Sequence, residues 1–510
     1  MAPPPAHSSY PMRLSPLEGL MPNTYVRQIY CFPTSNPSSA VNVLSRGLRG
    51  LAQDVPYILS RLVSTTSASG IAVSAPCRNP EDLLSRHDLS DSISYAALQS
   101  AYFPPGAFTT APGNGIAPPE SLAPYPASPA VFAARATLVA GGLVLCVAVH
   151  HAMTDITGYG ALLKIWASHC RTSSSSSEDI GFDANWMNRA PLFSASTSSI
   201  SVPLPDLLHV RTPEEEAARS ARRSRYVPED FQTGIFYFPH TRLRALKGAV
   251  NAHIASRGAG ADAWVSTGDV LTSLLWSAII AATADGAEGD VVPDDATRTS
   301  TLSFPVQFRS VLRPPLPRDF LGAAFVMTNA KVLHKDVCLV SPPRANSNFV
   351  AARQQLKTES RAEAESPVDF VDIGALANVA LAIRRSTQGI DDAAVRQVLE
   401  CLEAHREVNP KAPLILGPPR YDAGGSWTSV VSWADQCIYE LDWGDDIGRC
   451  DAVRLSKMES ERDPIILPRV PGLDGDDGGL EVIMSYERTR MQRLADSPIM
   501  RQLAVLRYLS

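Results

Sequence analysis

Apolar positions along the chain follow two periodicities, one typical of strands and one typical of helices. Two apolar runs in residues 131–150 flank a turn at Ala140-Gly141-Gly142, which predicts a β-hairpin. Upstream, residues 25–32 are predicted to form a strand. Residues 40–61 carry apolar side chains at helical spacing, and Pro56 is expected to break that helix into two pieces. The first part of the chain therefore mixes strands with helices.

The rest of the chain continues this mixture. Helices are predicted at residues 157–170 and 267–281, and a last helix is expected to include residues 500–509. Four strand-like apolar runs are predicted, at residues 301–308, 323–329, 426–441 and 480–486. Strands mixed with helices in both halves predict an α/β (α+β) architecture.

Polar stretches separate these elements. Residues 214–225 have an acidic head and a basic tail, which favours a solvated helix or linker over a phosphate-binding patch. The surrounding segment, residues 197–226, is a reasonable crossover between two halves. Three further segments are predicted to be surface loops: residues 173–177, 284–295 and 471–479.

Charge and apolar run length bear on location and partners. The 510 residues include 46 Lys and Arg against 52 Asp and Glu, so 46 − 52 gives a net charge of −6. Nucleic-acid binding normally goes with a basic surplus, so this balance argues against it. The longest apolar stretch, residues 138–149, falls short of the ~20 residues that a membrane helix needs. The N-terminal sequence does not resemble a secretion signal. A soluble, cytoplasmic protein is expected.

Two residue counts refine this description. The eight cysteines are scattered without any C-x-x-C pair, which argues against a zinc ribbon and against a disulfide scaffold. Reduced thiols are expected, with Cys146 as a small core residue. Proline accounts for 41 residues, which is about 8% of the chain against a usual ~5%. This excess predicts many rigid loops and chain reversals.

The candidate chemistry lies at the end of the predicted hairpin, where His150-His151-Ala-Met-Thr-Asp155 joins it to the next helix. The end of a rigid strand is a place where a fold can aim a reactive side chain into a cleft. A neutral histidine can accept a proton from a hydroxyl or an amine at neutral pH. Asp155 could orient an imidazole, cap the helix or pair with a distant arginine.

Spacing alone leaves other interpretations open. The two histidines could both be structural. Metal binding by His150, His151 and Asp155 is disfavoured, because adjacent strand residues point to opposite faces, and no metal site is expected. The same alternation predicts a structural role for His150. A nucleophile elbow, a P-loop and a dinucleotide fingerprint are all missing from the sequence.

Five features in order resemble the BAHD acyltransferases, in particular their fungal, trichothecene O-acetyltransferase-like branch. Besides His-His-x-x-x-Asp, they are Leu-Ser-Pro-Leu-Glu at residues 14–18, the helix sequence at residues 267–276, Phe-Pro-Val-Gln-Phe-Arg at residues 304–309 and Ser432-Trp433 with Asp442-Trp443-Gly444. This sequence departs from the family's late signature, Asp-Phe-Gly-Trp-Gly, because Trp443 stands in place of Phe and Asp445 in place of the second aromatic residue. The departure puts in doubt how this loop packs.

The resemblance implies two chloramphenicol-acetyltransferase-like domains with a channel between them. We expect the boundary near residue 210, with residues 1–210 forming an N-terminal domain that carries His-His-x-x-x-Asp. Residues 211–510 would hold the crossover segment and a C-terminal domain with the Asp-Trp-Gly motif. An acyl-coenzyme A, most simply acetyl-coenzyme A, would be a cosubstrate rather than a permanently bound cofactor. The acceptor would be a terpenoid or polyketide alcohol, and the protein a monomer.

The resemblance also implies roles for single residues. His151 would act as general base in a ternary complex, without a covalent enzyme intermediate. Asp155 is expected to pair with Arg309 and hold the histidine loop in place. Asp442 and Gly444 would support the site structurally. Candidates for the oxyanion donors or the channel wall are three residues of one segment: Thr428, Ser432 and Trp433.

Two rival functions remain at this stage. A condensation-type enzyme would share His-His-x-x-x-Asp but take its acyl group from a carrier-protein thioester and form an amide or an ester. An inactive member of the family would serve as a binding protein. The intact His151 and Asp155 argue against the second rival, and the order of the motifs fits the coenzyme A branch better than the first.

Overall fold

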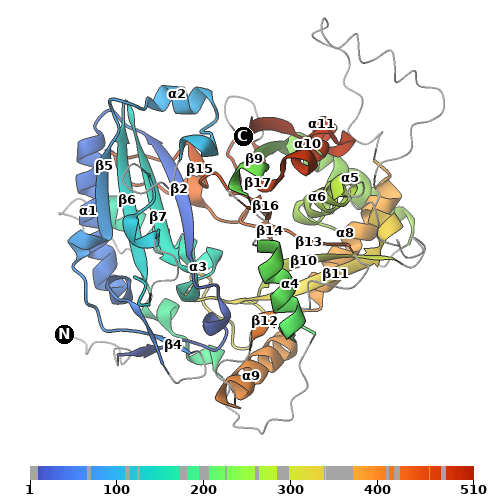
Figure 1. Ribbon diagram of the computed structural model, residues 1–510, viewed down its shortest axis with the longest axis horizontal. Coiled ribbons are helices and arrows are strands. Elements are labelled where there is room, and N and C mark those ends of the chain that lie inside the picture. The colour runs from blue at the N-terminus through green and yellow to red at the C-terminus, as the bar shows by residue number, and fades with distance from the viewer. Residues whose placement is uncertain are drawn as a thin grey trace, which may run out of the picture.

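A computed structural model shows the chain as two halves, each built of β-sheets flanked by helices (Figure 1). The structure describes all residues except 1–9, 66–69, 109–114, 123–126, 172–180, 194–205, 224–226, 259–262, 284–297, 338, 340–370, 409–412, 418–425, 459 and 473–477. Two of the predicted loops, residues 173–177 and 284–295, lie outside the described residues, and the third lies partly outside them.

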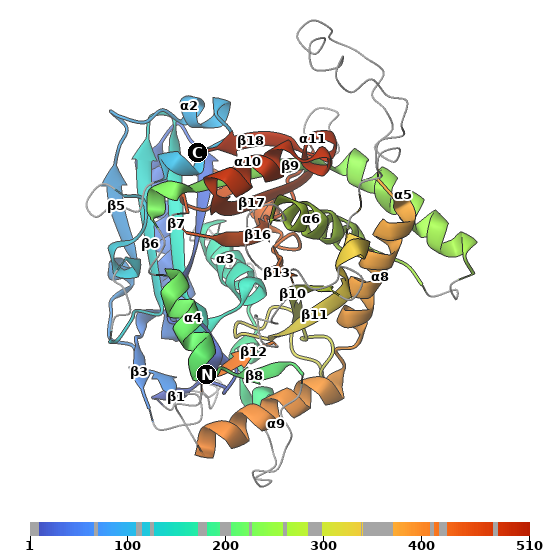
Figure 2. The same ribbon diagram turned by 45° about the vertical axis from the view of Figure 1, so that its right-hand side comes forward.

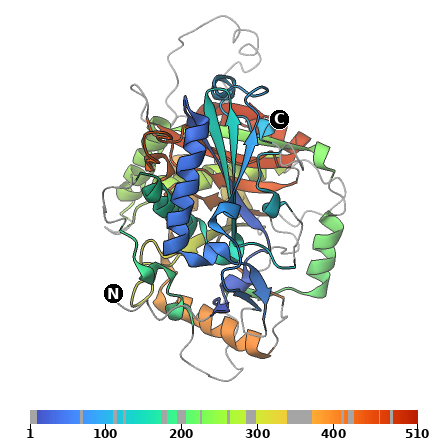
Figure 3. The same cartoon turned by 90° about the vertical axis from the view of Figure 1, so that its left-hand side faces the viewer.

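The first half is built on a five-stranded sheet. Its strands, in spatial order, are β15 (Ala452–Arg454), β2 (Tyr25–Pro33), β7 (Gly142–His150), β6 (Phe132–Val139) and β5 (Leu84–Asp88). Every residue of β7 is buried, which explains its near-continuous apolar sequence. Helices α1 (Pro37–Asp54) and α3 (Ile156–Arg171) pack together in the larger hydrophobic core. Figure 3 shows α1 lying along this sheet.

The second half contains two sheets. The five-stranded sheet has the order β14 (Val431–Ser432), β16 (Arg462–Ile466), β17 (Gly479–Glu487), β9 (Phe231–Pro239) and β18 (Val505–Leu509). The three-stranded sheet has the order β11 (Phe325–Leu333), β10 (Thr299–Gln307) and β13 (Ser426–Ser429). The helices around them are α5 (His240–Ser256), α6 (Thr267–Thr283), α8 (Ile373–Gln388), α10 (Arg488–Asp496) and α11 (Pro498–Leu503). Helix α6 is buried along almost its whole length.

Segments from the second half enter the first. Strand β15 pairs with β2, so residues late in the chain complete the first sheet. Helix α9 (Asp392–Val408) contributes Val395 and Leu402 to the first core, and β12 (Leu414–Leu416) pairs with β8 (Leu208–Val210). The two halves lie side by side, with α3, β13 and β16 near the boundary between them (Figure 2).

The smaller elements complete the outline. The strands β1 (Met12–Arg13), β3 (Leu62–Ser64) and β4 (Ile71–Val73) form a small separate sheet. Helix α2 (Tyr95–Ser100) covers the other face of the first sheet through a cluster that includes Ile29 and Cys146. The predicted solvated helix is present as α4 (Pro213–Arg223).

The predicted mixture of strands and helices is confirmed, and so are the hairpin at residues 131–150 and the helix that follows it. Three expectations need correction. The break expected at Pro56 is present, but the second piece is only a short 3₁₀ turn at Pro56–Leu59 and does not reach Arg61. The run at 426–441 contains only two short strands and then turns.

The third correction concerns the C-terminus, where the predicted helix over residues 500–509 is wrong beyond Leu503. Residues 505–509 form strand β18, which pairs with β9. The residues include Val505 and Tyr508, which favour strands, and pairing with an existing strand edge outweighs the local helical spacing of the apolar side chains.

Candidate active site

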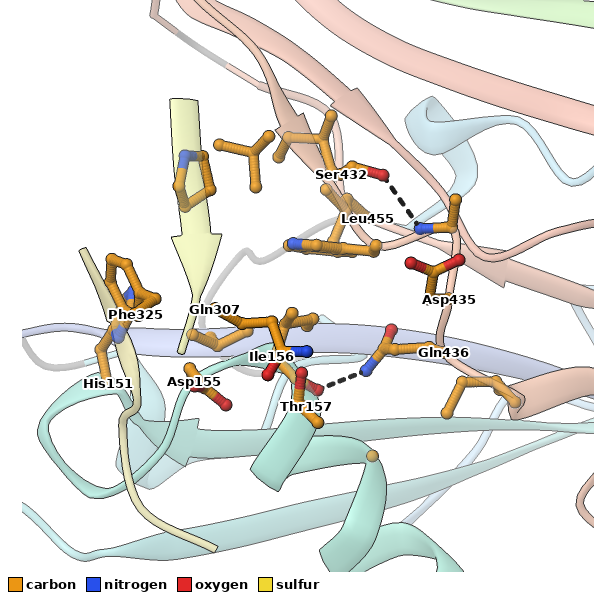
Figure 4. A pocket seen from close by; sticks show the side chains of 18 of the residues that line it. His151, Asp155, Ile156, Thr157, Gln307, Phe325, Ser432, Asp435, Gln436 and Leu455 are labelled. Atoms are coloured by element: carbon orange, nitrogen blue, oxygen red, sulfur yellow. Dashed lines mark hydrogen bonds between the residues drawn. The ribbon is translucent and has the colours of Figure 1, made fainter. Parts of the chain in front are cut away.

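A large cavity runs between the two halves. Its volume is about 2850 Å³, several times the usual ~300–1,000 Å³ of a site for one small molecule. Figure 4 shows His151, Asp155 and Thr157 from the first half on one side, with Ser432 and Asp435 from the second half on the other. This cavity has room for two substrates at once.

The histidine pair separates at the end of β7. The ring of His150 is buried, and its Nδ1 accepts a hydrogen bond from the backbone N–H of Ala152 over 3.3 Å. Its Nε2 therefore carries the proton and donates to Asn23 Oδ1 over 2.9 Å. Burial, followed by the charge of His151, lowers the pKa of His150 to about 4. His150 is thus a neutral structural histidine, as the alternation of the strand predicts.

His151 has a different environment. It begins a 3₁₀ turn, His151–Met153, which lies between β7 and α3, and its side chain lines the cavity. Its backbone N–H donates to Thr24 O over 2.8 Å, which fixes the turn against the start of β2. Its Nδ1 is buried and has no hydrogen-bond partner among the described residues.

The surroundings of His151 keep the imidazole neutral. Burial lowers its pKa, and the charge of Arg462 acts in the same direction. Its own carbonyl, Asp155 and the carbonyl of Thr154 act in the opposite direction and are weaker than burial. An imidazole that is neutral at neutral pH has a free lone pair and can accept a proton.

Asp155 lies directly after the histidine turn and pairs with Arg309, as the family resemblance implies. Arg309 donates from Nη1 to Oδ2 and from Nη2 to Oδ1, both over 2.7 Å. The carboxylate also accepts from the backbone N–H groups of Gly158 and Ala324, each over 2.9 Å. Four donors therefore occupy Asp155, which ties the start of α3 to the second half.

A second buried ion pair supports the histidine turn from the other side. Glu18 accepts from Arg189 Nε over 2.8 Å and from the backbone N–H of Ser15 over 2.8 Å. Arg189 in turn donates from Nη2 to the carbonyl of Met153, which closes the turn that begins at His151. The motif at residues 14–18 signals this site in the sequence, whereas the sequence analysis missed Arg189.

Only two of the three residues predicted to supply oxyanion donors or the channel wall line the cavity. Ser432 and Trp433 line it, and Ser432 Oγ accepts from the N–H of Ala434 over 3.4 Å. Thr428 is a wrong expectation: its side chain is buried outside the lining and lies near Asp463. Residues alternate between faces along β13, so its neighbour Ser429 lines the cavity instead.

The residues of the Asp-Trp-Gly motif are not among those that line the cavity, although the preceding Leu441 is. Trp443 is buried and contacts Phe32 and Trp166 edge to face, with ring centroids 5.8 and 5.3 Å apart. Asp442 Oδ1 accepts from the N–H of Gly444 over 3.0 Å, and Gly444 has a φ of +91°. The larger indole in place of phenylalanine therefore fills the first core.

Several lining residues were not found from the sequence. Gln307 and Phe325 line the cavity from β10 and β11, and Gln436 donates from Nε2 to the carbonyl of Ile156 over 2.9 Å (Figure 4). Gln307 lies inside the motif at residues 304–309, which was the available signal. Gln436 follows Ser432-Trp433 but belongs to no pattern that points to chemistry.

The described residues offer neither a metal-binding cluster nor a membrane-spanning helix. That part of the chain holds no group of three or more His, Cys, Asp or Glu side chains arranged to bind a metal ion. None of its helices combines the length and the apolar character of a membrane span.

Two family models match the chain. Residues 24–170 match the trichothecene 3-O-acetyltransferase-like N-terminal domain, which ends within α3. Residues 118–498, well over half of the chain, match the Transferase family. The chain belongs to the Transferase family. This is a family of BAHD-type acyltransferases, so the resemblance noted in the sequence is confirmed.

Curated relatives span nearly the whole chain. The O-acetyltransferase ptmV of Penicillium ochrochloron is 25% identical over 97% of this chain and 96% of its own length. The O-acetyltransferase astG of Aspergillus oryzae is 25% identical over 90% of this chain and 95% of its own length.

Solved structures resemble this chain in fold over nearly its whole length. F. sporotrichioides TRI101 complexed with coenzyme A and T-2 is 19% identical, covers 98% of this chain and 100% of its own, and superposes with a TM-score of 0.71. The structure of vinorine synthase is 14% identical, covers 98% of this chain and 95% of its own, and superposes with a TM-score of 0.55. These matches confirm the expected two-part fold.

Proposed function

We propose that this Transferase family member is a coenzyme A-dependent O-acetyltransferase that acts on a hydroxyl group of a fungal secondary metabolite. The observation that carries the proposal is a neutral, cavity-lining His151 placed between two halves, in a cavity large enough for an acyl donor and an acceptor. The relatives ptmV and astG, both named O-acetyltransferases, support the acyl group and the type of acceptor.

The reaction needs no covalent enzyme intermediate. His151 removes the proton of the acceptor hydroxyl as its oxygen attacks the thioester carbonyl of acetyl-coenzyme A. The C–S bond then breaks, the sulfur leaves with a proton from the imidazolium, and the products are an acetyl ester and free coenzyme A. Both substrates must therefore lie in the cavity together, with the acceptor oxygen beside His151.

Other residues would position the histidine turn and stabilise the tetrahedral oxyanion. Asp155 is a positioning residue, because Arg309, Gly158 and Ala324 already use its oxygens. The tetrahedral oxyanion needs hydrogen-bond donors at ~2.7–3.1 Å. Ser432 is our candidate donor, since its oxygen accepts from Ala434 and its O–H is left to donate.

A direct test is to incubate the full-length protein with acetyl-coenzyme A and a fungal metabolite extract, and to search by mass spectrometry for a metabolite that gains one acetyl group. His151→Ala should lower the rate of this acetylation by at least the ~10²–10⁴-fold that a general base contributes. Near-normal acetylation by the variant would overturn the assignment. Acetylation only from a pantetheinyl carrier-protein thioester would instead identify a condensation-type enzyme.

A further inference from the structure

Two arginines from different halves line the same cavity as His151. Arg27 lies on β2, opposite Ala148 in the register with β7, and thus three residues before His151 along the neighbouring strand. Arg462 is the first residue of β16 in the second half. The two arginines therefore approach the cavity from opposite sides of the boundary between the halves.

Neither guanidinium forms an ion pair with a carboxylate among the residues that the structure describes. Arg27 donates from Nη1 to the carbonyl of Ser121 over 2.7 Å, and among the described residues no carboxylate lies within ion-pair distance of it. The Arg462 side chain lines the cavity, and its guanidinium makes no hydrogen bond or ion pair within the described part of the chain. Burial, with Arg27 as a further cause, lowers the pKa of Arg462.

The nearby carboxylates are occupied by other groups. Asp463, which adjoins Arg462 and partly offsets its charge, accepts from Ser429 Oγ over 2.7 Å and from the Tyr486 hydroxyl over 3.2 Å. Glu461 pairs with Arg490 over 2.7 Å. Two guanidinium charges that line one cavity, with no ion-pair partner among the described residues, repel each other, and binding of an anionic ligand relieves that repulsion.

We propose that Arg27 and Arg462 form a binding subsite for an anionic group, most simply a carboxylate, on the acceptor alcohol. The inference rests on the proposed acyl transfer at His151 and adds the chemical class of the acceptor: a hydroxy acid rather than a neutral alcohol. Guanidinium groups suit this role because their planar N–H donors match the two oxygens of a carboxylate.

The position of Arg462 favours the acceptor over the coenzyme as the source of the anion. Arg462 is close enough to His151 for its charge to lower the pKa of the imidazole. In the reaction, the groups beside His151 are the acceptor hydroxyl and the thioester. The coenzyme's phosphates are separated from that thioester by the whole length of the pantetheine arm, so they reach a more distant part of the cavity.

The test uses the full-length protein saturated with coenzyme A and a panel of hydroxy acids, each paired with its own methyl ester. Calorimetric titration gives the affinity for both members of each pair. We expect wild-type protein to bind at least one acid about tenfold or more tightly than its ester, in line with a charge-assisted hydrogen bond. Arg462→Gln and Arg27→Gln should each abolish that preference, whereas Arg462→Lys should keep part of it.

Arg493→Gln is the matched control, because it removes the same charge from an exposed position of α10 outside the cavity lining. The proposed subsite is overturned if wild-type protein binds the acid and the ester of every pair with equal affinity, or binds neither of them. A loss of affinity for coenzyme A in Arg462→Gln with the acid preference unchanged also overturns it. Acid preference without acetyl transfer to any acceptor would contradict the proposed function and leave the subsite standing.

Discussion

The two adjacent histidines have opposite roles because their surroundings differ. His150 is enclosed by Asn23 and the N–H of Ala152, while His151 opens into the cavity, and its buried Nδ1 has no hydrogen-bond partner in the described part of the chain. Both have lowered pKa values, chiefly through burial. The consequences can be measured separately, because the pKa of one affects the rate and that of the other affects stability.

The lowered pKa of His151 should extend activity into acid. The base works when neutral, so the rate falls only as the pH drops through the pKa in the folded enzyme, which lies below the ordinary 6.5. We expect kcat/KM for the acceptor to decline in acid with a midpoint below pH 6.5. A pH–rate profile with its acidic midpoint at or above 6.5 would contradict the described environment of His151.

His150 should make the fold less stable in acid. Its pKa is 6.5 in the unfolded chain and about 4 in the folded one. As the pH falls between these values, the unfolded chain gains a proton that the folded chain does not bind. Stability is then lost at up to ~1.4 kcal/mol per pH unit.

The comparison is between wild type and His150→Gln in urea unfolding at pH 7 and pH 5. Wild type should lose about 2 kcal/mol more than the variant between these two pH values, since the variant lacks the titrating group. An identical pH dependence of the two proteins would show that His150 is not held neutral.

At the scale of elements, the start of α3 depends on a partner from the other half of the chain. Asp155 caps this helix by accepting from Gly158 and receives Arg309 and the N–H of Ala324 from the second half. Replacing Asp155 by Asn puts an NH₂ group opposite some of these donors and leaves Arg309 buried without its counter-charge.

We therefore expect Asp155→Asn to lower the free energy of unfolding by about 3–5 kcal/mol, as breaking one side of a buried pair does. The acetylation rate should fall for two reasons: a smaller fraction of the variant is folded, and in the folded protein His151 is displaced. Adding Arg309→Gln should cost less than the sum of the single effects. A variant of normal stability that is inactive would instead assign Asp155 a direct catalytic role.

Elements with local signals could be predicted from the sequence, and pairings between distant segments could not. The hairpin and α3 follow from apolar spacing within about forty residues, so the histidine turn was placed correctly. Strand β15 has only three residues, and nothing in Ala452–Arg454 shows that it completes a sheet begun at residue 25. Arg27, Arg189 and Arg462 matter through neighbours far along the chain, which spacing does not reveal.

At the scale of the molecule, the two halves are joined by a buried charge network beside the cavity. Arg454 on β15 of the first sheet donates to both oxygens of Glu481 on β17 of the second sheet, over 2.6 and 3.0 Å. Arg507 on β18 donates to the same carboxylate over 2.7 Å. The three side chains connect two sheets and the C-terminal strand.

Glu481→Gln should therefore weaken the coupling of the halves. It leaves Arg454, which is 2% exposed, with no negative partner, so the free energy of unfolding should fall by about 3–5 kcal/mol. Calorimetry should show that unfolding of the variant is spread over a broader range of temperature than that of wild type, or is split into two transitions, because the two cores are no longer tied at this point. Arg507→Gln, which keeps the Arg454–Glu481 pair, is the milder control. A uniform downward shift of one sharp transition in Glu481→Gln would mean that the remaining contacts, such as β15 with β2, are enough to unfold the halves together.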